Sequence, residues 1–455
     1  MNLRRSLTLF DVALFFVIVC KNLQWVATAA AAGPTSLPVW LIGCAAMFVP
    51  VSVAVMWLSW KYPDEGGMYM WTKRAFGPFA GFMTGWTYWC TNLPYFPALL
   101  YFTAGNALFF LSANPNPFSA SPVYFVATSL GCFAIVTILN VLGLDIGKWL
   151  TNVGAVSRFA VTILLIVLGT VAWIKFGSAT PVTAQTIRPS LQVKDMIFWS
   201  LIAFAWTGAE SAPLMAGEVK DARRCLPLGL AIAALPIAAI YILGTAAVLA
   251  AVPAAQVSGL YGVMQAIAHV ATAIHLPALT TVAALLLTVS CLASVGAWLG
   301  AVARIPFVAG IDRYLPDAFA RMHPRWHSPV AAILTQVGIS AVFIVLGQGG
   351  TTVKGAYDVL VSSTVLITMV PFLLLFASAI KLRTTPVVAI AAGVGLFTTI
   401  SSLILSAFPS PDEPNKPLAV AKIICLTGFM LGSGAVLYYV GRRRHQALAR
   451  AASID

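Results

Sequence analysis

The chain has 455 residues, of which 60% are hydrophobic and only 9% are charged, and its mean hydropathy is +0.90. This composition excludes a water-soluble globular protein, whose surface needs many more charged side chains. The formal net charge of +13 would suit a nucleic-acid partner, but the distribution of the charges along the chain argues against one.

The apolar residues form about a dozen long runs. A helix needs roughly 20 apolar residues to cross a bilayer, and runs of this kind lie at 10–32, 37–60, 77–111, 121–143, 148–174, 196–219, 226–252, 277–307, 328–347, 357–379, 386–408 and 418–440. They are continuously apolar rather than alternating, which excludes a transmembrane barrel. The sequence therefore predicts an all-α polytopic membrane protein with about 12 transmembrane helices.

The first run has two interpretations. Arg4 and Arg5, an apolar stretch and the small residues 27–29 resemble a cleaved secretory signal. Against this, the polar residues Lys21-Asn22-Leu23-Gln24 interrupt the stretch, and cleavage would leave an odd number of spans with the basic tail outside. We therefore expect 10–32 to remain as the first span.

The basic residues predict the orientation. With a cytoplasmic N-terminus, 19 of the 27 Lys and Arg fall in cytoplasmic segments and 6 fall outside, while Lys21 and Arg158 lie within the membrane. The positive-inside rule then places both termini in the cytoplasm of a cell-membrane protein. Residues 442–444 are three arginines that suit anionic membrane lipid rather than nucleic acid.

Within the sixth run, the stretch 196–216 contains the carboxylate of Glu210. An ionisable side chain at membrane depth is costly unless it lines a protein-enclosed or watery path, so Glu210 is a candidate functional residue. Gly208 and Pro213 bracket it and predict a broken helix.

Interruptions in the first and sixth spans, five spans apart, are typical of an inverted repeat with a binding site at the two breaks. We expect one membrane domain, 1–455, in which 1–175 and 195–385 are the two repeats, 386–440 forms two peripheral helices and 441–455 is a basic cytoplasmic tail. Backbone groups freed at helix breaks bind carboxylate or ammonium groups. The architecture therefore favours a small zwitterionic or charged solute.

The sequence shows no pattern typical of an enzyme or a metalloprotein. Its seven cysteines have no disulfide or metal-binding spacing, and we find no phosphate-binding loop or nucleophile triad. We therefore expect no cofactor, no metal and no enzymatic activity.

Four segments resemble the amino acid–polyamine–organocation superfamily, which has the leucine-transporter-like fold. They are the loop and third span from Tyr62-Pro-Asp-Glu-Gly-Gly to Trp89, the stretch from Gly208-Ala-Glu-Ser to Pro227, Ala293-Ser-Val-Gly-Ala-Trp298 with 314–321, and Val361-Ser-Ser-Thr to Pro371. In the sixth, eighth and tenth spans the chain is similar to the arginine–agmatine antiporter. The resemblance implies alternating-access transport of amino acids or related amines, and it leaves a homodimer open.

The resemblance also implies roles for individual residues. Phe204 would be an aromatic gate, Glu210 a proton-sensing carboxylate and Trp298 a substrate contact. The other expected site residues are Gly208 in the sixth span, Thr91 and Asn92 in the third and Ser362 and Ser363 in the tenth.

The chain departs from the family at the first break, where Gly-Ser-Gly is usual and Asn22-Leu23-Gln24 stands instead. Either the Asn22 and Gln24 amides grip a substrate carboxylate in place of bare backbone, or the substrate is not an ordinary α-amino acid. Lys21 would add a cation at this break, or would reach the interface as a snorkelling amine.

Arg158 in the fifth span stands near a position where proton-coupled relatives often carry Lys. Arginine stays protonated, so Arg158 can replace a sodium ion but cannot carry a coupling proton. Coupling then falls to Glu210, because exclusion of water disfavours the charged carboxylate. The alternative for Arg158 is a structural role in which it pairs with helix carbonyls. The alternative for Glu210 is a structural role in which it stays protonated, or permanently paired, and holds neighbouring helices together.

We therefore expect a secondary active transporter of amino acids or related amines, coupled to protons or to exchange. The two cations near the first and fifth spans also allow an acidic substrate. A transporter-like solute sensor or channel without active accumulation is the alternative function.

Overall fold

A computed structural model of the chain describes residues 8–19, 22–62, 67–110, 117–142, 144–189, 192–211, 219–303, 314–315, 319, 323, 328–382, 385–409 and 413–451. The α-helices of the first half are α1 (Leu9–Val19), α2 (Leu23–Ala31), α3 (Ser36–Gly43), α4 (Val49–Lys61), α5 (Met68–Phe76), α6 (Pro78–Cys90), α7 (Asn92–Ala107), α8 (Pro122–Leu142) and α9 (Leu144–Phe176). Those of the second half are α10 (Val193–Ala205), α12 (Ala222–Ala251), α13 (Gly262–Ala273), α14 (Ala278–Val302), α16 (Val330–Gln348), α17 (Val353–Lys381), α18 (Pro386–Ser406) and α19 (Lys416–Ala451). The shorter helical turns are η1 (Cys44–Phe48), η2 (Leu108–Phe110), η3 (Pro117–Ala120), η4 (Ala209–Ser211) and η5 (Ala254–Gln256).

The predicted polytopic helical fold is confirmed. In the described ranges nine helical segments are long and apolar enough to cross a membrane, and they correspond to the second, fourth, fifth and seventh to twelfth predicted spans. The first, third and sixth predicted spans are each divided into shorter pieces. Large apolar side chains exposed on the outer helices suit contact with lipid tails; examples are Ile135, Ile138, Ile163, Val167, Phe397 and Ile404.

The first span is broken slightly earlier than the sequence indicates. Helix α1 ends at Val19, and α2 already begins at Leu23. Asn22 caps α2 with extended backbone angles, φ −140° and ψ 129°. Its short polar side chain suits this position, because it can accept a hydrogen bond from the first turn of the helix. Leu23 and Gln24, which we expected at the break, therefore belong to the helix.

The third span is divided at Thr91, between α6 and α7. Pro94 and Pro97 lie in α7 and lack the amide hydrogens that would bond to the carbonyls of Cys90 and Leu93. The prolines thus weaken the helix one turn before each of them, which explains the division. The structure therefore places a helix boundary inside the third predicted span.

The second span contains a π-helical turn, η1, between α3 and α4. Gly43 lies just before this turn, where an added Cβ would come within 2.6 Å of Ile202 and 2.9 Å of Trp206. The glycine therefore allows α3 to approach α10 closely. This contact holds the sixth span against the second directly before the sixth-span break.

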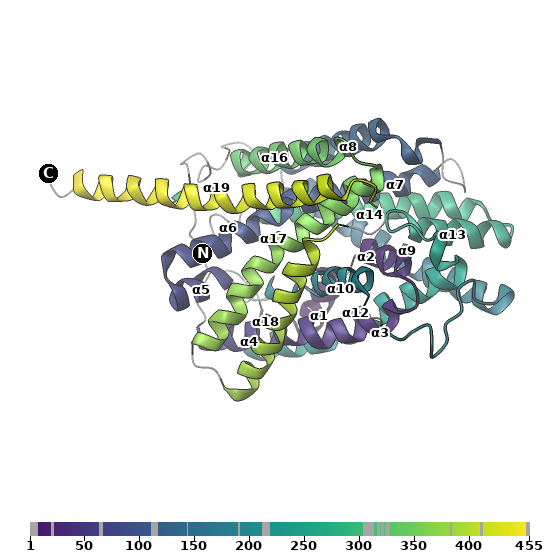
Figure 1. The fold of residues 1–455 in the computed structure, drawn as a ribbon, viewed down its shortest axis with the longest axis horizontal. Coiled ribbons are helices and arrows are strands. Elements are labelled where there is room, and N and C mark those ends of the chain that lie inside the picture. Colours follow the sequence, from purple (N-terminus) through teal and green to yellow (C-terminus); the bar gives the residue numbers. More distant parts are fainter. Residues whose placement is uncertain are drawn as a thin grey trace.

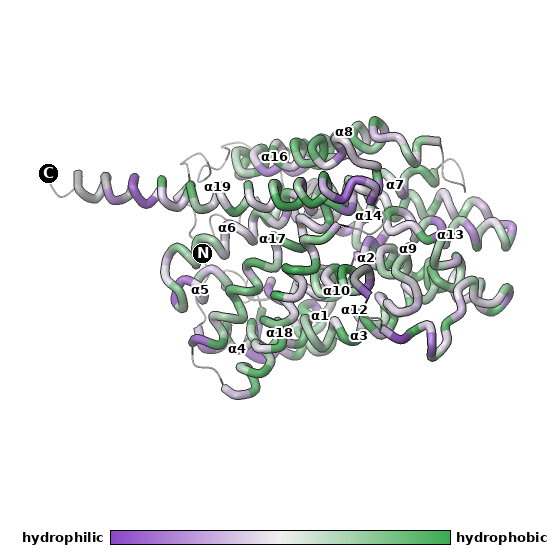
Figure 2. Tube along the Cα trace, in the orientation of Figure 1, coloured by the Kyte–Doolittle hydropathy of each residue, from purple (hydrophilic) through white to green (hydrophobic). Residues whose placement is uncertain are grey.

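The helices form an elongated bundle, and α19 projects beyond it at one end (Figure 1). The projecting part of α19 lies toward the end of the long axis where α5 lies, whereas α13 lies at the other end. The projecting part of α19 includes hydrophilic residues (Figure 2), among them the exposed arginines 442–444. Helix α18 packs against α10 and α17, and α19 packs against α6 and α17.

Candidate functional site

A cavity lies where the two broken spans meet. Its volume is about 80 Å³ when only the space that the centre of a water molecule can reach is counted. One water molecule needs roughly 10–15 Å³ of such space. The cavity therefore has room for a small solute. Its lining residues are Asn22, Trp25, Tyr88, Thr91, Asn92, Tyr95, Phe204, Ala205, Thr207, Gly208, Glu210, Trp298 and Thr368.

Seven residues expected from the sequence lie on this wall: Asn22, Thr91, Asn92, Phe204, Gly208, Glu210 and Trp298. Four other residues expected to contact the substrate do not line the cavity. Leu23 and Gln24 are buried in α2, and Ser362 and Ser363 are buried in α17. Lys21 lies outside the described residues.

Asn22 is held by hydrogen bonds to three different partners. Its Oδ1 accepts from the Gln24 backbone N–H at 3.1 Å, and its Nδ2 donates to the Tyr95 hydroxyl at 3.1 Å. Its own backbone N–H donates to the Tyr241 hydroxyl at 3.3 Å. The amide thus satisfies the start of α2 and ties it to the third span, rather than pointing freely into the cavity.

Tyr241 of α12 connects the two breaks, and no pattern in the sequence indicates this contact. Its hydroxyl accepts from Asn22 and donates to the carbonyl of Ala205 at the end of α10, at 3.2 Å. The ring stacks on Trp40 with centroids 4.2 Å apart, and it meets the fully buried Trp206 edge-on at 5.7 Å. A single hydroxyl therefore forms hydrogen bonds with a backbone N–H at the first break and with a backbone carbonyl at the second.

Glu210 lies in η4, directly after the break that follows α10. It is 8% exposed, and its Oε2 accepts from the Gly208 backbone N–H at 2.6 Å. Its Oε1 accepts from the Tyr88 hydroxyl of α6 at 3.4 Å, a long contact. Gly208 has φ +125°, a conformation that side-chain-bearing residues rarely adopt. The glycine therefore shapes the turn that aims its N–H at the carboxylate.

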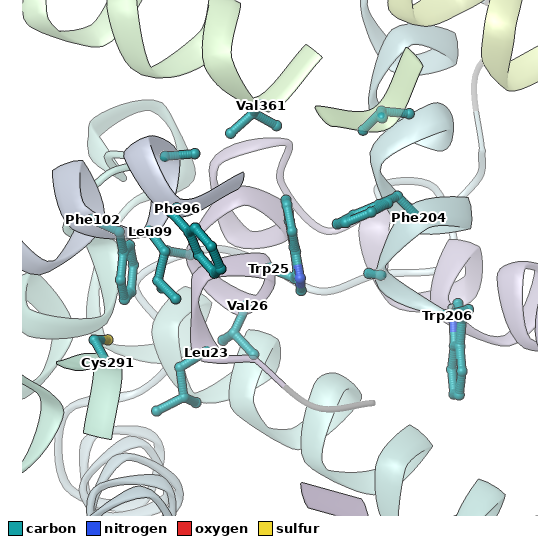
Figure 3. Close-up of a cluster of buried hydrophobic side chains, with 14 of the residues drawn as sticks. Leu23, Trp25, Val26, Phe96, Leu99, Phe102, Phe204, Trp206, Cys291 and Val361 are labelled. Carbon is teal, nitrogen blue, oxygen red and sulfur yellow. The ribbon is translucent and has the colours of Figure 1, made fainter. Parts of the chain in front are cut away.

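Two aromatic rings from the broken spans face each other across this region. Trp25 of α2 and Phe204 of α10 meet edge-on with centroids 5.2 Å apart (Figure 3). Leu23, by contrast, lies apart from this pair in the same view. Phe204 also lies 6.4 Å from the Tyr95 ring. Trp25 thus shares the cavity wall with Phe204, the expected gate.

The third span presents one polar face to the cavity. Tyr88, Thr91, Asn92 and Tyr95 follow the spacing i, i+3, i+4 and i+7, which places them on one side of a helix. Thr368 of α17 donates to the Thr91 hydroxyl at 3.2 Å and joins this face from the tenth span. The two tyrosines were missed, although their spacing from Thr91 and Asn92 would have revealed them.

Arg158 of α9 contacts the eighth span rather than the cavity wall. Its guanidinium donates to the Ser290 hydroxyl at 3.1 Å and to the Ser294 hydroxyl. Ser294 in turn donates to the Ser290 carbonyl. These contacts join α9 to α14 through a side chain that stays positively charged. Ser294 lies four residues before Trp298, which lines the cavity.

A solute-sized cavity between the breaks of two spans, within a helical membrane bundle, is the arrangement of a secondary transporter. The comparisons with known proteins agree with this class. The profile described as amino acid permease matches residues 7–432. The chain belongs to the amino acid permease family, as the resemblance of its spans to the amino acid–polyamine–organocation superfamily indicates. It is accordingly a multi-pass membrane transporter and not an enzyme.

Curated relatives are also transporters. An uncharacterized transporter of Legionella pneumophila is 28% identical over 94% of this chain and 95% of its own length. A protein of Lactococcus lactis named probable agmatine/putrescine antiporter AguD is 24% identical over 56% of this chain and 54% of its own. The glutamate/serine transporter AimA of Bacillus subtilis is 23% identical over 70% of this chain and 61% of its own.

Among solved structures, the crystal structure of MhsT in complex with L-phenylalanine has a similar fold. The TM-score is 0.58, with 14% sequence identity, and the match covers 89% of this chain and 100% of the MhsT chain. At this identity the likeness concerns the fold alone, and it supports the predicted leucine-transporter-like architecture.

Proposed function

We propose that the chain is a secondary active transporter of amino acids or related amines that works by alternating access. The observation that carries the proposal is the cavity wall, to which both broken spans contribute, with Asn22 from one and Gly208 and Glu210 from the other. The walls on either side belong to different helices, so a movement of α2 and α10 would open the cavity to one side of the membrane at a time.

Glu210 is the coupling residue in this proposal. It is buried, it lies on the cavity wall, and it can accept either a proton or a cationic solute. Alternate loading of one carboxylate would couple solute movement to protons or to exchange. Phe204, packed against Trp25, would close the cavity from one side as an aromatic gate.

We also propose an orientation, a repeat structure, a cellular location and an oligomeric state for this transporter. Both termini would lie in the cytoplasm, because the Lys and Arg residues concentrate in the segments that this orientation places there. Residues 1–175 and 195–385 would be the two inverted repeats. The cell membrane would be the location of the protein, and a homodimer would be compatible with its exposed outer helices.

Solute flux tests the proposal. Purified protein in liposomes would be loaded with one solute, diluted into a panel of amino acids and amines, and exposed to imposed pH gradients. We expect saturable uptake or exchange that depends on the gradient. Binding without any accumulation would contradict active transport and favour a solute sensor.

The role of Glu210 is tested in the same liposomes with Glu210→Gln. We expect this variant to lose gradient-driven accumulation, because glutamine cannot take up the proton. Asp11→Asn is the matched control, since it makes the same chemical change at an exposed carboxylate in α1. If Glu210→Gln accumulated solute in a pH-dependent manner like the wild type, another group would carry the coupling.

A further inference from the structure

Three backbone donors at the first break are already bonded. A helix that starts inside a membrane protein exposes N–H groups that can bind an anion such as a substrate carboxylate. Here the Gln24 N–H donates to the Asn22 side chain and the Asn22 N–H donates to Tyr241. The Trp25 N–H donates to the Asn22 carbonyl at 3.2 Å. These three donors are occupied within the protein.

One described donor at the second break is also bonded, and its partner is itself a carboxylate. The Gly208 N–H donates to Glu210 Oε2 at 2.6 Å. The protein's own carboxylate thus occupies the place where this turn would hold the carboxylate of a substrate. A second carboxylate beside it would meet a like charge and would find these backbone donors already in use.

The rest of the wall suits a cation. Among the lining residues that the structure describes, Glu210 is the only carboxylate, and none is Lys, Arg or His. Ammonium groups are attracted to carboxylates and to the faces of aromatic rings, especially where water is excluded. The aromatic residues of the wall are Trp25, Tyr88, Tyr95, Phe204 and Trp298. Arg158 does not line the cavity, and its guanidinium contacts Ser290 and Ser294.

We propose that this site selects an organic amine that lacks a carboxylate, with the ammonium group on Glu210 and the carbon skeleton between the aromatic rings. The inference rests on the proposed transport function and names its substrate class. It answers the question raised by Asn22-Leu23-Gln24, because the amide of Asn22 caps its own helix instead of gripping a carboxylate. The substrate is then not an ordinary α-amino acid.

Matched pairs of solutes that differ only in the α-carboxylate test this inference. Suitable pairs are leucine with isoamylamine, lysine with cadaverine, and arginine with agmatine. Equilibrium binding to the purified full-length protein is measured by calorimetry, and by quenching of tryptophan fluorescence, since Trp25 and Trp298 line the cavity. In every pair that binds, we expect the amine to bind at least about 10-fold more tightly than the amino acid.

The outcomes separate this inference from the transport proposal. An amino acid that binds as tightly as its amine, or more tightly, overturns the inference and leaves transport standing. Binding of none of the six solutes also overturns it, and the flux assay in liposomes then decides whether the transport proposal falls as well.

A variant adds a second test of the contact with Glu210. Glu210→Gln is expected to weaken amine binding at least about 10-fold and to reduce the discrimination within each pair, whereas Asp11→Asn should keep both. Retention of the full discrimination by a folded Glu210→Gln protein would overturn the assignment of the ammonium to this carboxylate. If that variant does not fold, the comparison of pairs in the wild-type protein still decides the matter.

Discussion

Replacement of Tyr241 by phenylalanine is expected to loosen the joint between the two broken spans. The variant keeps the ring that stacks on Trp40 but loses the hydroxyl that accepts from the Asn22 N–H and donates to the Ala205 carbonyl. The two backbone groups belong to α2 and α10, which both contribute to the cavity wall. Their relative position should therefore become less well defined.

The size of the effect follows from the two hydrogen bonds. Each contributes about 0.5–1.5 kcal/mol, and a buried group left unpaired costs about 1–3 kcal/mol. Both bonds are long, at 3.3 and 3.2 Å, and water from the cavity can reach the half-buried Asn22. We therefore take about 1 kcal/mol for each bond, or about 2 kcal/mol in total. If solute binding must restore the joint, the affinity should fall by up to about 30-fold.

The assay combines thermal unfolding in detergent with solute binding. Tyr124→Phe serves as the control, because it removes a hydroxyl that donates to the Ala104 carbonyl at 3.0 Å, away from both breaks. We expect Tyr124→Phe to lose about 1 kcal/mol of stability and to bind solute like the wild type. The reasoning is refuted if Tyr241→Phe binds solute with wild-type affinity, or if both variants weaken binding equally.

Three further predictions concern other parts of the structure. Gly208→Ala should destabilise the protein by about 1–3 kcal/mol, because φ is +125° there; Gly131→Ala, at an open helical position, should be nearly neutral in thermal unfolding. Replacement of external sodium by an impermeant cation should leave solute flux unchanged. The reason is that the Arg158 guanidinium, which donates to the Ser290 and Ser294 hydroxyls of the eighth span, can replace a sodium ion there. Sodium-dependent flux would contradict this. Lys422→Met should cost about 1–2 kcal/mol of stability with unchanged solute affinity, because the Lys422 ammonium donates to the carbonyls of Gly347 and Gly349 at the C-terminal end of α16. Lys416→Met is its control, because Lys416 lies at the exposed start of α19, the helix that also contains Lys422. Equal destabilisation by both variants would contradict the capping role of Lys422.

The spans and their interruptions could be predicted from the sequence because both are local properties. A continuous apolar run has only one stable arrangement in lipid, a helix whose backbone bonds are internal. Polar residues at 21–24 and the glycine and carboxylate at 208 and 210 disturb such a run wherever it packs. The exact boundary was less predictable, since the capping of α2 by Asn22 depends on backbone angles that shift the break to before Leu23.

The tenth span shows why a stretch can be predicted more easily than the face it presents. Ser362 and Ser363 belong to the segment expected near the cavity, but Thr368 is the residue of α17 that lines it. Neighbouring helical residues point about 100° apart, so a small error in rotation exchanges wall residues for packing residues. The rotation of α17 is set by the helices around it, which a single segment does not encode.

The sequence by itself determined that this chain is a helical membrane protein with two broken spans and a carboxylate at the second break, because these features follow from local hydropathy and from the cost of charge in lipid. Only the tertiary structure decided which groups of the protein form hydrogen bonds with the backbone at those breaks. Tyr241 joins them from a helix more than 200 residues away from Asn22, and Gly208 donates to Glu210 instead of remaining open. Such contacts depend on the relative positions of several helices, and those positions are fixed by packing.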